Sequence, residues 1–188
     1  MKKFLLIMSC TLLVAGLFLG FNIAFVSYPV KQELEEDERN DGITLIAYHQ
    51  YLINYSTLVL DLRELRTSQA SPLDITRMLF QSAKALKDKK FGKIILSYRG
   101  SAKFFLDGDY FKDLGEEFSN NQNPLYLMRT LPQNVKALDG TPEFGERSGG
   151  IIYVMTKQME DLQSLHRRWW SNDVETAHLI ESLHQKPE

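Results

Sequence analysis

An uncharged apolar run near the amino terminus, residues 4–25, constrains this chain more than any other feature. The run follows two lysines, and its only polar interruptions are Ser9, Cys10, Thr11 and Asn22. As an α-helix it would span about 33 Å, enough to cross a hydrocarbon core of about 30 Å. Inside lipid such a segment must be helical, because every backbone N–H and C=O needs an internal partner. We therefore predict a transmembrane signal-anchor helix over residues 4–27.

The charges on either side of the run predict its orientation. Lys2 and Lys3 precede it, and acidic residues dominate the sequence that follows. Since positive flanks stay in the cytoplasm, we expect residues 1–3 in the cytoplasm and the rest on the extracytoplasmic or periplasmic side of the plasma (inner) membrane. Two alternatives stay open. One is a cleaved secretory signal with rough cleavage sites after Ala15 and Ala24, and the other is a lipoprotein modified at Cys10.

Residues 28–42 are predicted to form an acidic juxtamembrane linker. From Val30 to Gly42 there are six acids against two bases, so this stretch offers little apolar surface to bury. The remaining residues, 43–188, carry 18 basic and 18 acidic side chains and are numerous enough for one globular domain with its own core. A net charge of −2 argues against nucleic-acid binding, and one cysteine cannot form an internal disulfide.

Two short apolar runs and a well-marked helix between them predict a βαβ unit. Residues 57–62 and 93–98 are rich in β-branched and aliphatic side chains and too short for helices. Between them Ser71, Pro72 and Asp74 have the spacing of a helix amino terminus with a capping box. A turn at residues 99–101 predicts an antiparallel partner strand next. The expected fold class is therefore α/β, with α+β also possible: one mixed sheet with covering helices.

The other segments are predicted with less detail. Helices are expected after residue 107, from residue 151 to about 170, and again near the carboxyl terminus, and residues 133–150 are read as a long surface loop. Residues 125–131 fit either a strand or a helix. The same ambiguity holds for residues 43–55, where apolar side chains are nearly continuous.

Weak catalytic candidates gather around the predicted sheet. Asp61 and Arg99 would lie near the carboxyl ends of adjacent parallel strands, the edge where open α/β sheets bind ligands. Such a pair can serve acid–base chemistry or be a plain ion pair. Arg129 and His166 complete this set of candidates for a cleft closed by residues 133–150. The sequence holds no nucleophile motif or phosphate-binding loop, and we predict neither a cofactor nor a metal.

A cluster of two arginines and two tryptophans predicts a binding surface. Arg167, Arg168, Trp169 and Trp170 are of the types that anchor protein interfaces, although one buried and one rim tryptophan would also fit. We therefore expect a binding or assembly module, held in the bilayer by residues 4–27 and meeting a protein partner at the outer membrane face. The alternative is a hydrolase-type envelope enzyme with its site near Asp61 and Arg99, and a small-ligand sensor is a third possibility.

Overall fold

A computed structural model of the chain describes residues 2–66 and 70–184. The helical elements before the sheet are α1 (Lys2–Asn22), η1 (Ile23–Ser27), α2 (Tyr28–Glu35) and η2 (Glu38–Asn40). The strands are β1 (Ile43–Gln50), β2 (Asn54–Leu65), β3 (Lys93–Tyr98), β4 (Ser101–Asp107) and β5 (Val135–Lys136). The later helical elements are α3 (Pro72–Leu86), α4 (Gly108–Ser119), α5 (Pro124–Thr130), η3 (Leu131–Asn134), α6 (Ile151–His166), η4 (Arg167–Ser171) and α7 (Asn172–His184).

The strands form one five-stranded mixed sheet in the order β1-β2-β3-β4-β5. β2 and β3 are parallel, with Leu60 opposite Leu96, and the other neighbouring pairs are antiparallel. The connection between β2 and β3 runs through α3, so the predicted βαβ unit is confirmed, as is the mixed α/β fold. The predicted turn at residues 99–101 leads into β4, which is antiparallel to β3 as expected, and Arg99 and Gly100 have positive φ.

Residues 43–55, for which the sequence left helix and strand open, form β1, a turn and the start of β2. Side chains at odd positions of β1 are buried and those at even positions are more exposed, a period of two that only a strand produces. The alternation is hard to read from the sequence because Thr44, Ile46 and Tyr48 on the outer face are themselves largely apolar. Residues 125–131, also open, form α5 and the start of η3.

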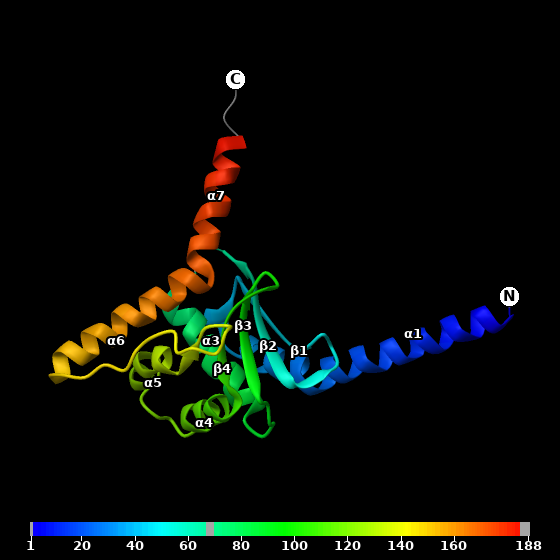
Figure 1. Cartoon of the computed structure of the whole chain (residues 1–188), viewed down its shortest axis with the longest axis horizontal. Coiled ribbons are helices and arrows are strands. Elements are labelled where there is room, and N and C mark those ends of the chain that lie inside the picture. Colours follow the sequence, from blue (N-terminus) through cyan, green and yellow to red (C-terminus); the bar gives the residue numbers. More distant parts are fainter. Residues whose placement is uncertain (1, 67–69, 185–188) are drawn as a thin grey trace.

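Helices α3 and α4 cover one face of the sheet (Figure 1). Ser71 and Asp74 form the predicted capping box at the start of α3, and the buried side chains of this helix join those of β2 and β3 in the core. The two helices approach closely at Gly115, where an added Cβ would lie 2.3 Å from the carbonyl oxygen of Ala83. Later in the chain, Trp169 from η4 completes the core with no exposed surface.

The structure differs from the predicted linker over residues 28–42. Helix α2 occupies residues 28–35 and packs on α3, with Val30 and Leu34 buried. Together with Val26 these residues repeat every four positions and form an apolar stripe, while the acidic residues lie mostly on the outer side of the helix. Glu33 accepts a 2.6 Å hydrogen bond from Lys84 of α3. Residues 28–42 are therefore part of the folded domain.

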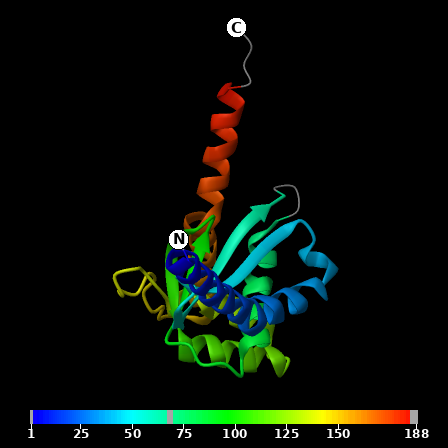
Figure 2. The same cartoon turned by 90° about the vertical axis from the view of Figure 1, so that its right-hand side faces the viewer.

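Helix α1 extends away from the domain, and η1 and α2 continue it onto the edge of the sheet (Figures 1 and 2). Its apolar side chains that the structure places are exposed, among them Phe4, Leu13 and Leu17; the side chain of Cys10 lies outside the described part. Within the described residues, no helix combines the length and the apolar character that crossing a membrane requires. The predicted 4–27 segment also includes η1, which packs on the domain through Val26.

Candidate functional site

β1 forms one edge of the sheet, and its outward backbone groups define the candidate site. The carbonyl oxygen of Gly42, just before β1, accepts a hydrogen bond from the N–H of Arg66, just after β2. Even-numbered residues of β1 therefore direct their backbone groups toward β2, and odd-numbered residues direct theirs to the free side. The free side thus presents the N–H and C=O groups of Ile43, Leu45 and Ala47 and the N–H of His49, whose carbonyl oxygen instead accepts a hydrogen bond from the Leu52 N–H in the turn.

Side chains from the preceding helix satisfy one half of this edge. The Ser27 hydroxyl donates a 2.6 Å hydrogen bond to the carbonyl oxygen of Ala47. The side-chain oxygen of Asn22 accepts a 2.8 Å hydrogen bond from the backbone N–H of His49, and its amide donates to the carbonyl of Leu52 at 2.8 Å. Asn22, within the apolar run, and Ser27, just after it, therefore fasten the helix to β1.

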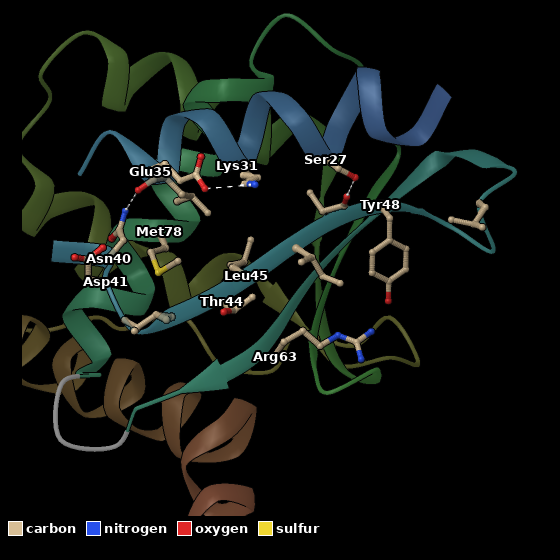
Figure 3. Close-up of a pocket in the computed structure, with 16 residues that line it drawn as sticks. Ser27, Lys31, Glu35, Asn40, Asp41, Thr44, Leu45, Tyr48, Arg63 and Met78 are labelled. Atoms are coloured by element: carbon tan, nitrogen blue, oxygen red, sulfur yellow. Dashed lines mark hydrogen bonds and ion pairs between the residues drawn. The ribbon is translucent and has the colours of Figure 1, made fainter. Parts of the chain in front are cut away.

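The other half of the edge is open and lines a groove of about 830 Å³ (Figure 3). The continuous helix of η1 and α2 contacts β1 at Ser27, the last residue of η1, and α2 diverges from the strand toward Asn40 and Asp41, so the groove widens along the strand. Among the described residues, the outward backbone groups of Ile43 and Leu45 have no hydrogen-bond partner. A stretch of unpaired strand backbone therefore lies inside a groove, beside a helix.

The groove is apolar inside and carries charges of both signs at its rim. Leu34 of α2, Leu45 of β1 and Met78 of α3 supply buried apolar surface. At the rim, the Lys31 ammonium lies 3.5 Å from the Glu35 carboxylate, and both side chains are largely exposed. With Asp41 and Arg63, the lining holds two cations and two anions, so it has no strong preference for a charged ligand.

A polar network holds the wide end of the groove in place. The Asn40 amide donates at 2.8 Å to the carbonyl oxygen of Leu34 and to the side-chain oxygen of Gln81. Gln81 also donates to Asp37 at 2.8 Å. Hydrogen bonds from the Arg39 guanidinium to Asp37 hold the pKa of that carboxyl well below its usual range. The chain between α2 and β1 is therefore tied to α3 by interactions that persist across ordinary pH.

The structure places Asp61 near the turn that contains Arg99, but its charge partner is Arg63. Arg63 Nη2 lies 2.6 Å from the fully buried Asp61 carboxylate, which also accepts hydrogen bonds from the N–H of Gly100 and the Tyr48 hydroxyl. Burial and the negative charge of Asp61 raise the pKa of Tyr48. Arg99 is exposed and directs its Nε–H to the carbonyl oxygen of Arg63 at 3.3 Å. The carboxylate is therefore fully engaged in structural contacts.

The remaining catalytic candidates lie in other surroundings. Arg129 on α5 stacks its guanidinium over the Tyr126 ring at 5.7 Å. His166 at the end of α6 is buried, with Nε2 2.8 Å from the Thr76 hydroxyl. Neither shares a described contact with Asp61 or Arg99. Among the side chains that the structure describes, no three His, Cys, Asp or Glu groups converge on a point where a metal ion would bind.

The arginine–tryptophan cluster divides between core and surface. Trp169 is fully buried and donates its indole N–H to the carbonyl oxygen of Ser97 at 3.0 Å, and Trp170 is 7% exposed. Arg167 and Arg168 are exposed, and Arg168 forms an ion pair with Glu143. A partner cannot reach the two indole rings in this fold, so the accessible part of the predicted surface is the pair of arginines.

Sequence reasoning missed the residues that build the groove. The sequence places Ser27 in the predicted anchor, and Lys31, Leu34 and Asp41 in the predicted linker. The available signal was the four-residue spacing of Val26, Val30 and Leu34, which crosses the boundary between those two segments. The unpaired backbone of β1 has no side-chain signature at all.

Comparison of the chain with protein-family models, with curated proteins and with solved structures finds no match.

Proposed function

We propose that this protein is a membrane-anchored, extracytoplasmic binding module that takes up an extended segment of a partner protein along β1. The observation that carries this proposal is the unpaired backbone of Ile43 and Leu45 inside the groove beside α2. Strand addition to an exposed sheet edge is a common way of recognising peptides, because main-chain hydrogen bonds supply affinity and neighbouring pockets supply specificity.

The edge lacks the features that usually prevent strand pairing. Natural sheets protect their edges with lysine, proline, bulges or a covering element. β1 contains no lysine or proline. Its register with β2 shifts between Thr44 and Leu45, where the extra residue, Arg63, lies in β2, and again between His49 and Gln50, next to the turn. The helix covers the edge only around Ala47 and His49. The stretch from Ile43 to Ala47 spans about 13 Å at about 3.3 Å per residue, which is enough for a short added strand.

The lining of the groove suggests the chemistry of the partner segment. Leu34 and Met78 favour an apolar side chain directed inward, and the balanced rim charges favour a segment without strong net charge. Extended backbone supplies one N–H and one C=O to meet those of Leu45. The proposed partner is thus an extended, mostly apolar and weakly charged polypeptide segment.

Membrane anchoring is part of the proposal and rests on α1. The run from Phe4 to Phe21 contains no charge, and large apolar side chains of α1 are exposed to the surroundings. Lys2 and Lys3 favour a cytoplasmic amino end. An uncleaved helix is supported by the contacts of Asn22 and Val26 with the domain, since cleavage after Ala24 would remove the side chain that caps His49.

Photo-crosslinking in intact membranes tests the binding mode. A benzoylphenylalanine at Thr44, which lines the groove, is expected to form an adduct with another protein. The same group at Thr156, exposed on α6, serves as the control. Leu45→Pro removes the outward N–H without removing a sheet hydrogen bond, and Leu45→Ala shortens the same side chain but keeps the N–H.

Loss of the adduct in Leu45→Pro and its retention in Leu45→Ala would support strand addition. The control is that both variants show a cooperative thermal unfolding transition, as a folded domain does. An adduct unaffected by Leu45→Pro would contradict it. An adduct of double mass, from two copies of this chain, would show that the edge pairs with itself and would contradict a separate partner.

The hydrolase alternative receives less support from the site geometry. Asp61 has no exposed surface, and its carboxylate is occupied by Arg63, Gly100 and Tyr48. A general acid or base has to come within hydrogen-bond reach of a substrate. The small-ligand alternative is favoured by one observation, because the groove volume lies in the range of about 300–1,000 Å³ typical of small-molecule sites. Under that alternative, Leu45→Pro would leave binding intact.

A further inference from the structure

The turn between β1 and β2 is strained and exposes large apolar side chains. Tyr51 and Leu52 have positive φ values of 55° and 64°, in the left-handed region. Hairpin turns that require such angles usually place Asn or Gly there, since a larger residue costs about 1–2 kcal/mol. Tyr51 is nevertheless 77% exposed and Ile53 is 59% exposed. A turn that only had to reverse the chain in water would favour small polar residues.

This turn lies against the base of α1. The Asn22 amide donates to the carbonyl oxygen of Leu52, and the Phe21 ring meets the Tyr55 ring edge-on at a centroid distance of 4.9 Å. Figure 1 shows the β1–β2 turn at the side of the domain from which α1 emerges. The exposed apolar surface of the turn therefore continues that of the helix.

Lysines border the same surface. Lys89 lies with its ammonium 5.0 Å from the centroid of the Phe25 ring, and Lys90 beside it is exposed. Both line a depression of about 530 Å³ that also includes Tyr55. Tyrosine rings and lysine side chains are the residues that proteins place at the level of lipid headgroups, where an apolar body meets a charged and wet layer.

Because α2 packs on the domain, no free linker separates α1 from the domain. Val26 and Val30 are buried in the domain, so the freely projecting part of the apolar run ends near Phe21. From Phe4 to Phe21 a helix spans about 27 Å, slightly less than a hydrocarbon core of about 30 Å. A bilayer that holds this stretch, as the proposed anchor requires, would come directly against the turn and its lysines.

We propose that residues 51–55 enter the headgroup region of the outer leaflet beside α1, with Lys89 and Lys90 facing the phosphates of anionic phospholipids. This inference rests on the membrane anchor of the proposed function and adds a second contact with the same bilayer. It accounts for the exposed apolar side chains of the turn, because apolar surface that is unfavourable in water becomes favourable when lipid covers it.

Fluorescence quenching in proteoliposomes tests the contact with the full-length protein. In a Cys10→Ser background, single cysteines replace Ile53 in the turn, Leu17 in α1 and Ile151 at the start of α6, each exposed in the structure. Each is labelled with the environment-sensitive dye NBD and reconstituted in phosphatidylcholine and phosphatidylglycerol brominated near the headgroup. NBD at positions 53 and 17 is expected to shift to shorter wavelength and lose emission to the brominated lipid, and NBD at position 151 is expected to do neither.

The three positions separate the two levels of the proposal. If position 17 is quenched and position 53 behaves like position 151, the turn lies in water and the inference is overturned while the anchor stands. If position 17 is not quenched, the anchor itself fails. Lys89→Gln with Lys90→Gln is expected to weaken quenching at position 53 only when phosphatidylglycerol is present. Unchanged quenching there would overturn the role of the lysines.

Discussion

The indole N–H of Trp170 donates a 3.0 Å hydrogen bond to Nδ1 of His166. Because an indole N–H can only donate, Nδ1 carries a lone pair, so the proton of the neutral ring is on Nε2 and points to the Thr76 hydroxyl at 2.8 Å. Thr76 in turn donates to the carbonyl oxygen of Pro72. Burial lowers the pKa of His166 to about 3. The ring is therefore a neutral link between η4 and α3.

This link predicts a pH dependence of stability. The unfolded chain takes up a proton on His166 below about pH 6.5, whereas the folded chain does so only near pH 3. The contribution of neutral His166 to the free energy of unfolding is thus complete above pH 6.5. It is lost as the pH falls toward 3, by up to about 1.4 kcal/mol per pH unit. In detergent, urea unfolding of His166→Gln is expected to show a shallower loss of stability with acid than the parent chain.

His49 provides the comparison for that experiment. Its pKa is also lowered, mainly by burial, but it lies at the opposite end of the sheet beside Asn22. A His49→Gln variant is expected to keep the pH dependence of stability that His166 causes. Parallel pH curves for the parent chain and His166→Gln would show that His166 is not the titrating group.

The buried Asp61 carboxylate predicts an asymmetry between two variants. Arg63→Ala leaves a buried anion without its cation, whereas Asp61→Asn removes the charge and keeps an oxygen for the Gly100 N–H. Removing one partner of a buried ion pair costs up to about 3–5 kcal/mol, and the half-exposed position of Arg63 reduces this figure. We expect Arg63→Ala to be the less stable variant at pH 7 in urea unfolding. Equal loss of stability in Arg63→Ala and Asp61→Asn would contradict this account.

The contact of α3 with α4 predicts that Gly115→Ala destabilises the domain. The new Cβ would overlap the backbone carbonyl of Ala83, which cannot move without shifting α3. Overpacking of this kind costs about 1–3 kcal/mol. Gly145→Ala, where the added Cβ has no neighbour within 4 Å, is the matched control. Thermal unfolding should show a lower midpoint for Gly115→Ala alone, and a midpoint equal to that of the control would mean that the helices can separate freely.

The two caps on β1 predict an order of effects. Asn22→Ala leaves the N–H of His49 without a partner in a buried position, which costs about 1–3 kcal/mol. Ser27→Ala frees the carbonyl oxygen of Ala47 at the narrow end of the groove, which both residues line. Water from the groove can replace the hydroxyl, so the loss of stability should be smaller. Hydrogen exchange of the β1 amides should be faster in Asn22→Ala than in Ser27→Ala. The reverse order would show that Ser27 is the main fastening point.

The βαβ unit was predictable because its signals are local. Ser71, Pro72 and Asp74 mark a helix start by hydrogen bonds within four residues, and the flanking strands are too short and too β-branched for helices. The order of strands at that point then follows from chain connectivity.

The groove was not predictable because its parts are tertiary. The acidic residues around Glu33 and Asp37 dominate the composition of 28–42, and they obscure the three apolar residues that dock α2. The outward direction of Leu45 backbone groups depends on the register with β2, which no single segment encodes. Trp169 and Trp170 show the same limit, since residue type alone does not say which side of the surface a ring occupies.

With α1 as the proposed anchor, the packing of α2 on α3 limits the distance that can separate the groove from the membrane. A domain on a flexible tether sweeps a wide volume, whereas one joined through a folded helix stays in a thin layer next to the lipid. The partner must then provide the flexible segment, and this segment must be long enough to reach the groove at the membrane surface. This chain could not gain reach by lengthening residues 28–35 without giving up the burial of Val30 and Leu34.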